Sequence, residues 1–226
     1  MTTLRTTDRS TTYDPTSRNA GIVAGLLFLT ATVTFLIGDS LIAAFFSTPA
    51  GGVGSATLAI GVSLQAVCAV AGAGIGFALL RILGRHSPVM AKGYLAFRCL
   101  EGIAIIAIGA YVLSTENMLA HYEILIYGFT GVAGLILSYL LHRTRLVPEW
   151  LSWLGMIGYV AILLAIPSTL LNLATLDAGP GMLLYVPGGL FELILPILLI
   201  ARGFRRTTPD VTSIVPPSRT AAGAHA

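Results

Sequence analysis

Residues 56–80 read ATLAIGVSLQAVCAVAGAGIGFALL, a run of 25 residues without Asp, Glu, Lys or Arg. About 20 consecutive apolar residues form a helix long enough to span the hydrocarbon core of a bilayer, which is about 30 Å thick. The run is too long for a single strand and does not alternate between apolar and polar residues. It therefore predicts a transmembrane helix.

Five further apolar stretches of similar length predict further spans, at about residues 20–38, 92–113, 121–142, 151–171 and 181–201. Turn-forming residues such as Pro49, Pro88, Pro148 and Pro180 separate them. Charged residues make up only 10% of the 226 residues, against about 25% in a typical soluble domain. We therefore expect an all-α fold, a polytopic membrane bundle of six helices over residues 19–203. The polar segments 1–18 and 204–226 are expected to be disordered tails.

Basic residues are unevenly distributed between the predicted loops. The loops after the first, third and fifth spans contain no Lys or Arg, whereas both tails and the other two loops do. Positive residues favour the cytoplasmic side of a membrane. We therefore expect a multi-pass protein of the plasma membrane with both termini in the cytoplasm, and Asp39 at the outer end of the first span.

Three charged residues lie well inside predicted spans, away from the ends of the spans. Arg98 lies about 9 Å into the third span at 1.5 Å per residue, and Glu101 follows three positions later on the same helix face. Glu192 lies about 13 Å into the sixth span from its cytoplasmic end. A lone charge at the centre of a spanning helix costs about 2.5–3.5 kcal/mol. We therefore expect the third and sixth spans to be neighbours, with Arg98 bridging Glu101 and Glu192.

This charged cluster has two interpretations. Ionisable groups within a membrane are typical of proton relays and polar substrate sites, but a neutralised cluster can also fix helix packing. Residues that interrupt helices lie on both sides of Glu192, which favours a transport site. They are Pro187, Gly188, Gly189 and Pro196. Other polar residues in or near the spans are candidates for lining a path: Gln65, His121, Glu123 and Asn172.

Three functions remain open from these residues. The first is a transporter or proton-coupled carrier whose two sets of three spans have opposite orientations. The second is a structural or regulatory membrane protein, and the third is an enzyme that acts on a lipid or a quinone. The sequence contains no phosphate-binding glycine loop, no metalloprotease motif and no nucleophile elbow. No catalytic residue, metal, cofactor or nucleic-acid partner is therefore expected. The expected partners are the lipid bilayer and a proton or small polar solute, and a homo-oligomer or a membrane partner stays open.

Several short motifs occur one after another along the chain. They are Arg18-Asn19-Ala20-Gly21, Arg98-Cys99-Leu100-Glu101-Gly102, Tyr127-Gly128-Phe129, Val147-Pro148-Glu149-Trp150 and Phe191-Glu192-Leu193, followed by Arg202-Gly203-Phe204. With these motifs the chain resembles the DUF4386 family of uncharacterised bacterial integral membrane proteins over most of residues 18–204. The resemblance implies a location in the bacterial cytoplasmic membrane and places Arg98, Glu101 and Glu192 at motif positions. It implies no activity.

Overall fold

The computed structural model describes residues 15–48, 54–171 and 179–204, which are helical apart from short turns. No strand occurs among these residues. The elements are α1 (Pro15–Ser47), α2 (Ser55–Gly84), α3 (Pro88–Thr115), α4 (Tyr122–Thr144), α5 (Glu149–Leu170), the 3-10 helix η1 (Gly179–Leu184) and α6 (Val186–Arg202). The all-α architecture with six α-helices agrees with the prediction. The predicted tails lie largely in 1–14 and 205–226, outside the described residues, and residues 15–18 begin α1 instead.

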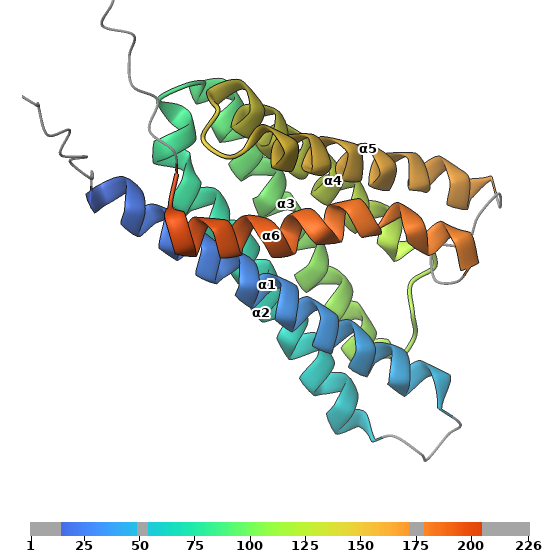
Figure 1. Cartoon of the computed structure of the whole chain (residues 1–226). Helices are drawn as coiled ribbons and strands as arrows, with labels where there is room; N and C mark the ends of the chain where they lie inside the picture. The colour runs from blue at the N-terminus through green and yellow to red at the C-terminus, as the bar shows by residue number, and fades with distance from the viewer. Residues whose placement is uncertain (1–14, 49–53, 172–178, 205–226) are drawn as a thin grey trace, which may run out of the picture.

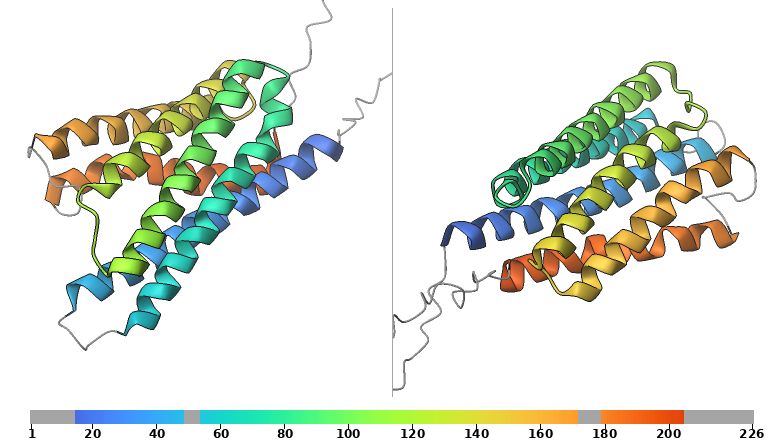
Figure 2. Two further views of the ribbon diagram at one scale, coloured as in Figure 1. Left: turned by 180° about the vertical axis from the view of Figure 1, so that it is seen from behind. Right: turned by 90° about the horizontal axis from the view of Figure 1, so that it is seen from above.

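The helices pack in the order of a closed ring. Each helix packs against its neighbours in sequence, and α6 packs against α1 to close the ring. Figure 1 and the left view of Figure 2 show two groups, α1–α3 and α4–α6, that meet at one end and diverge toward the other. We call these groups the two arms. Their main contacts with each other are those of α3 with α4 and of α1 with α6.

Glycines allow the backbones to approach closely where the helices pack. A Cβ atom on Gly158 of α5 would overlap the backbone of Gly188 in α6. A Cβ atom on Gly25 of α1 would lie 2.9 Å from the carbonyl oxygen of Pro196 in α6. In a membrane no hydrophobic force drives one apolar helix against another, so helices associate where small residues let their backbones pack closely. These contacts hold α6 between α5 and α1.

Five of the helices, α1 to α5, are long and apolar enough to cross a membrane. Their outward faces carry large apolar side chains such as Val70, Phe77 and Ile103, each more than 60% exposed. Water disfavours a continuous apolar surface of this kind, whereas lipid covers it without cost. The chain is thus an integral membrane protein by the length and composition of its helices.

The described helices differ from the predicted spans at two places. The first helix does not end near Asp39 but continues to Ser47, so Asp39 lies within α1. The predicted span 181–201 is divided into η1 and the 17-residue α6, which is shorter than the other helices. Pro187 accounts for the second difference, because proline favours the first turn of a helix, where its missing N–H costs nothing.

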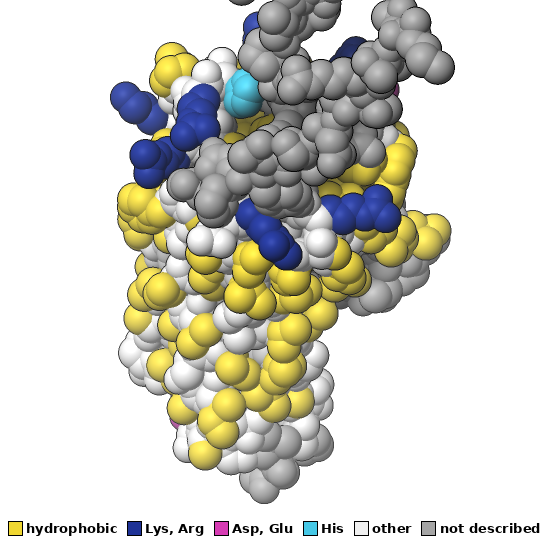
Figure 3. Space-filling view, turned by 60° about the vertical axis from the view of Figure 1, so that its left-hand side comes forward, with side chains coloured by type: hydrophobic (Ala, Val, Ile, Leu, Met, Phe, Trp, Pro, Cys, Tyr) yellow, Lys and Arg dark blue, Asp and Glu magenta, His cyan; other side chains and the backbone are white. Residues whose placement is uncertain are grey.

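The exposed basic side chains gather at the end where the arms meet. Arg18, Arg81, Arg143 and Arg202 lie near the start of α1 and near the ends of α2, α4 and α6. In Figure 3 the Lys and Arg side chains lie toward one end, and the face below them is apolar or uncharged. The charge separation read from the loops is therefore present in the folded molecule.

Candidate functional site

A buried ion pair on α3 forms the centre of the site. Arg98 Nη1 donates a hydrogen bond to Glu101 Oε2 over 2.9 Å, and both side chains are nearly inaccessible, at 7% and 11% exposure. Arg98 Nε donates to the hydroxyl of Tyr94 over 3.3 Å. Residues three and four apart lie on the same face of a helix, so the local sequence alone brings these groups together.

Thr130 of α4 connects this pair to the second arm. Its hydroxyl lies 2.7 Å from Glu101 Oε1 and 2.9 Å from the carbonyl oxygen of Ile126. A hydroxyl carries one proton, so it can donate to only one of these two acceptors at a time. The hydrogen bond between Thr130 and Glu101 links the side chains of α3 and α4, and it therefore lies at a junction of the two arms.

Glu192 occupies the opposite side of the ring. Its Oε1 accepts a hydrogen bond of 2.9 Å from the hydroxyl of Tyr159 on α5. The ring of Tyr159 packs edge-on against Phe191, with 5.7 Å between ring centroids, and lies directly over Gly134 of α4. Because Gly134 has no side chain, the tyrosine can pass α4 closely and present its hydroxyl to Glu192.

The two halves of the site approach each other across the ring. The described structure contains no ion pair between Arg98 and Glu192, and α3 packs against α2 and α4 rather than against α6. The expectation that these two spans are packed neighbours is therefore wrong, because the ring order places them opposite each other. Arg98 nevertheless interacts electrostatically with both Glu192 and Tyr159. Its guanidinium also lies 5.8 Å from the ring centroid of Phe28 on α1, within the range of a cation–π contact.

The site thus draws on every helix of the ring. Cys68 of α2 lies close to the charges of Glu101, Arg98 and Glu192. One cation faces two carboxylates, so the set is one proton short of neutrality. We call Tyr94, Arg98, Glu101, Thr130, Tyr159 and Glu192 the central network.

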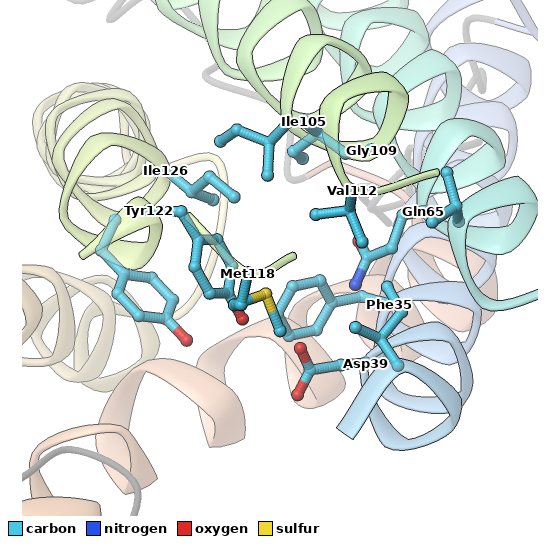
Figure 4. Close-up of a pocket in the computed structure, with 13 residues that line it drawn as sticks. Phe35, Asp39, Gln65, Ile105, Gly109, Val112, Met118, Tyr122 and Ile126 are labelled. Atoms are coloured by element: carbon cyan, nitrogen blue, oxygen red, sulfur yellow. The ribbon is translucent and has the colours of Figure 1, made fainter. Parts of the chain in front are cut away.

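A cavity borders the central network on the side away from the basic end. It has a volume of about 40 Å³, enough for two to four water molecules at about 10–15 Å³ each, and it is partly open to the exterior. Asp39 and Gln65 are its polar lining, together with two tyrosine hydroxyls (Figure 4). Its walls include Ile105, one turn beyond Glu101, and Ile126, one turn before Thr130. One layer of apolar side chains therefore separates the cavity from the network.

The structure describes only some of the residues that were predicted to line a path. Gln65 is buried and lines the cavity, whereas His121 is exposed at the residue before α4. Asn172 and the side chain of Glu123 lie outside the described residues. Their role in lining a path stays a prediction.

The helix-breaking residues near Glu192 interrupt α6 less than expected. Pro187, Gly188 and Gly189 form its first turn, so they precede the helix interior instead of breaking it. Pro196 is the one proline inside α6. It lacks the N–H that would bond to the carbonyl oxygen of Glu192, which weakens the helix one turn beyond the carboxylate.

Four residues of the site were not identified from the sequence. Tyr94 could have been found, because it precedes Arg98 by four positions and so shares its face. Thr130 and Tyr159 could not, because their contacts depend on the order of the ring. Asp39 was taken as the end of a span, and only the continuation of α1 reveals that it lines a cavity.

A second polar group lies between α4 and α5, toward the basic end. Ser138 Oγ, Ser152 Oγ and His142 Nδ1 are buried and have no hydrogen-bond partner in the part of the chain that the structure describes. Ser138 lies against Gly155, one turn from Ser152. Buried polar atoms are normally paired with protein or ordered water, so this group marks a place where water is expected.

Comparison with known families bears out the resemblance for the second half of the chain. Residues 109–203 match the model of DUF4386, a domain of unknown function. This range contains Thr130, Tyr159 and Glu192, whereas Arg98 and Glu101 precede it, so the resemblance of their motif stays a prediction. Neither the curated proteins nor the solved structures gave a match.

Proposed function

We propose that this protein is a transporter, in the form of a proton-coupled carrier of a small polar solute, and that the central network is its coupling site. The observation that carries the proposal is the position of the network. Its charges lie where the two arms join, beneath a cavity that opens between them. A carrier needs a cavity that binds its solute and an ionisable group close enough to be affected by the bound solute. Both must lie at a junction between parts of the protein that can move relative to each other.

The topology that this function requires has six spans and both ends in the cytoplasm. At 17 residues, α6 is about 26 Å long at 1.5 Å per residue, close to the lower limit for a span. Its place in the ring between α5 and α1 supports its role as the sixth span. The basic residues at the end where the arms meet support a cytoplasmic location for that end. The cavity then faces outward, and the location is the bacterial cytoplasmic membrane.

The mechanism that we propose depends on the one proton that the central network needs to become neutral. Arg98 can neutralise one of the two carboxylates, so one further proton makes the network neutral. With that proton on Glu192, Arg98 stays with Glu101, which also holds the Thr130 hydroxyl, and the arms are linked. When the proton leaves Glu192, that carboxylate attracts the guanidinium away from Glu101 and the link weakens. Proton binding thereby changes the contact between the arms.

Transport in proteoliposomes tests the coupling. The purified protein is reconstituted with a pH-sensitive dye inside the vesicles, and a set of anionic, zwitterionic and cationic solutes is added outside under an imposed pH gradient. We expect at least one solute to cause proton movement, and Glu192→Gln and Glu101→Gln to reduce it by tenfold or more. Glu149→Gln, the same change at an exposed residue outside the network, is the control. Unchanged proton movement in Glu192→Gln would exclude a coupling role for this carboxylate.

A structural role for the network is the second candidate. It is favoured by the burial of Arg98 and Glu101, which are sealed from the cavity by Ile105 and Ile126. Apolar residues can replace a buried ion pair without loss of stability when both partners are changed together. This role predicts that a variant with apolar residues at both Arg98 and Glu101 keeps its fold and any measured activity. A folded double variant without activity would contradict it.

A further inference from the structure

The outward cavity has a chemical character of its own, distinct from that of the central network. Asp39 projects its carboxylate into the cavity from α1, and the ring of Phe35 lies one turn before it (Figure 4). Tyr122 and Tyr127 of α4 and the thioether of Met118 complete the opposite side. Among the described residues, the cavity thus combines one carboxylate with three aromatic rings.

This combination is typical of one class of ligand. Aromatic faces attract ammonium groups through the ring quadrupole, most strongly when water is excluded. A carboxylate provides the opposite charge, and the lining contains no Lys, Arg or His that would repel a cation. We propose that the cavity binds a small organic ammonium ion, with its positive group held between Asp39 and the aromatic rings.

Other ligand classes fit the lining less well. An anion would meet the Asp39 carboxylate, and the described lining offers no Lys, Arg or His side chain to bind it. A hard metal ion such as Ca²⁺ takes six to eight oxygen ligands. The side chains of Asp39, Gln65, Tyr122 and Tyr127 together offer five oxygen atoms, in a wall that is otherwise apolar. At about 40 Å³ the cavity encloses only the ammonium group, and a larger substituent would extend through its open side.

The position of the cavity relates the ligand to the proposed coupling. Ile105 and Ile126 lie one helical turn from Glu101 and Thr130, so a bound cation lies one apolar layer from the network. A positive ligand there and a proton on the network repel each other through a medium of low dielectric constant. The ligand and the proton would therefore be bound alternately, as in an exchanger. This step, unlike binding itself, rests on the proposed carrier function.

Equilibrium binding to the full-length protein in detergent micelles tests the site. The probe is tetramethylammonium chloride, compared with sodium chloride at the same ionic strength and with tert-butanol as a neutral molecule of similar shape. We expect the ammonium salt alone to raise the thermal unfolding temperature in a saturable way. Asp39→Asn should weaken the apparent affinity by tenfold or more. The control, Glu116→Gln, makes the corresponding change of charge at an exposed residue outside the cavity and should have no effect.

The proposal is overturned if the folded wild-type protein gives the same response to all three probes, or if Asp39→Asn binds as tightly as the wild type. If Asp39→Asn does not fold, Phe35→Leu replaces it as the deciding variant, because it keeps the charge and removes a ring. Phe35→Leu should weaken binding several-fold, and unchanged affinity would overturn the proposal. Glu192→Gln separates the two proposals, since it should retain ammonium binding while losing coupled flux. Ammonium binding without any flux would refute the proposed carrier function but support the ammonium site. Proton-coupled flux without ammonium binding would support the carrier function but refute the ammonium site.

Discussion

Replacing Arg98 with methionine removes the positive charge of the central network and keeps an unbranched side chain in its place. In the wild-type protein the guanidinium pairs with Glu101 over 2.9 Å and contacts the hydroxyl of Tyr94. In the variant Glu101 keeps the hydrogen bond from Thr130 but loses its counter-charge. Since its side chain is only 11% exposed, water cannot replace the lost partner.

The expected loss of stability follows from this burial. Removing one partner of a buried ion pair typically costs about 3–5 kcal/mol, because the other charge stays behind without compensation. At about 1.4 kcal/mol per factor of ten, the unfolding equilibrium should shift by a factor of roughly 100 to 4,000. Adding Glu101→Gln removes the stranded charge as well. The double variant should therefore be more stable than the sum of the single losses predicts, with a coupling energy of about 1–3 kcal/mol.

Unfolding by sodium dodecyl sulfate from mild detergent micelles measures these changes, with the fluorescence of Trp150 and Trp153 as the signal. Lys92→Met is the matched control, because it removes an exposed basic residue from the same helix. We expect the control to lie within about 0.5 kcal/mol of the wild type. If Arg98→Met costs no more than Lys92→Met, the guanidinium is not a buried counter-charge and the reasoning fails.

Four further substitutions test the packing and the hydrogen bonds in the same unfolding assay. Thr130→Val keeps the shape but removes the 2.7 Å hydrogen bond to Glu101, and a loss of about 1.5–3 kcal/mol is expected for a bond to a charged group; no loss would mean that the hydroxyl bonds to its own helix. Gly158→Ala places a methyl group against the backbone of α6 and should cost at least about 1–3 kcal/mol. Gly72→Ala, where no atom of another helix lies within 4 Å of the new Cβ, should be neutral or stabilising and serves as its comparison. Ser138→Ala should cost about 1 kcal/mol, because the water expected beside its buried hydroxyl would lose a hydrogen-bond partner, and no loss would mean that no water is bound there.

The sequence predicts most of the fold for a simple physical reason. In a bilayer each helix satisfies its own backbone, so long apolar runs such as residues 56–80 predict helices directly. The exception is the sixth span, where Pro187 could lie inside a helix or at its start. Hydropathy does not distinguish these positions, whereas the structure places Pro187 in the first turn of α6.

Only the part of the candidate site that lies on a single helix could be predicted from the sequence. The spacing of Arg98 and Glu101 predicts that they share a helix face, and they do pair. The position of Glu192 depends on which helices are neighbours, and a chain of apolar spans carries little information about that order. The expected bridge from Arg98 to Glu192 assumed that α3 and α6 pack together. In the ring, Tyr159 is instead the direct hydrogen-bond partner of Glu192.

The closure of the ring has a consequence for how the chain can be built. Gly203, just after α6, lies against Gly21 and Arg18 near the start of α1, so the first and last helices of the ring meet where the chain enters and leaves it. Domains whose ends lie close together generally tolerate circular permutation. A short linker from Gly203 to Arg18, with new ends opened at the turn around His86, would give a permuted chain with the same six neighbour contacts. Both new ends would leave from the same side of the molecule as the old ones, so the permuted order would also preserve the distribution of basic residues between the two faces.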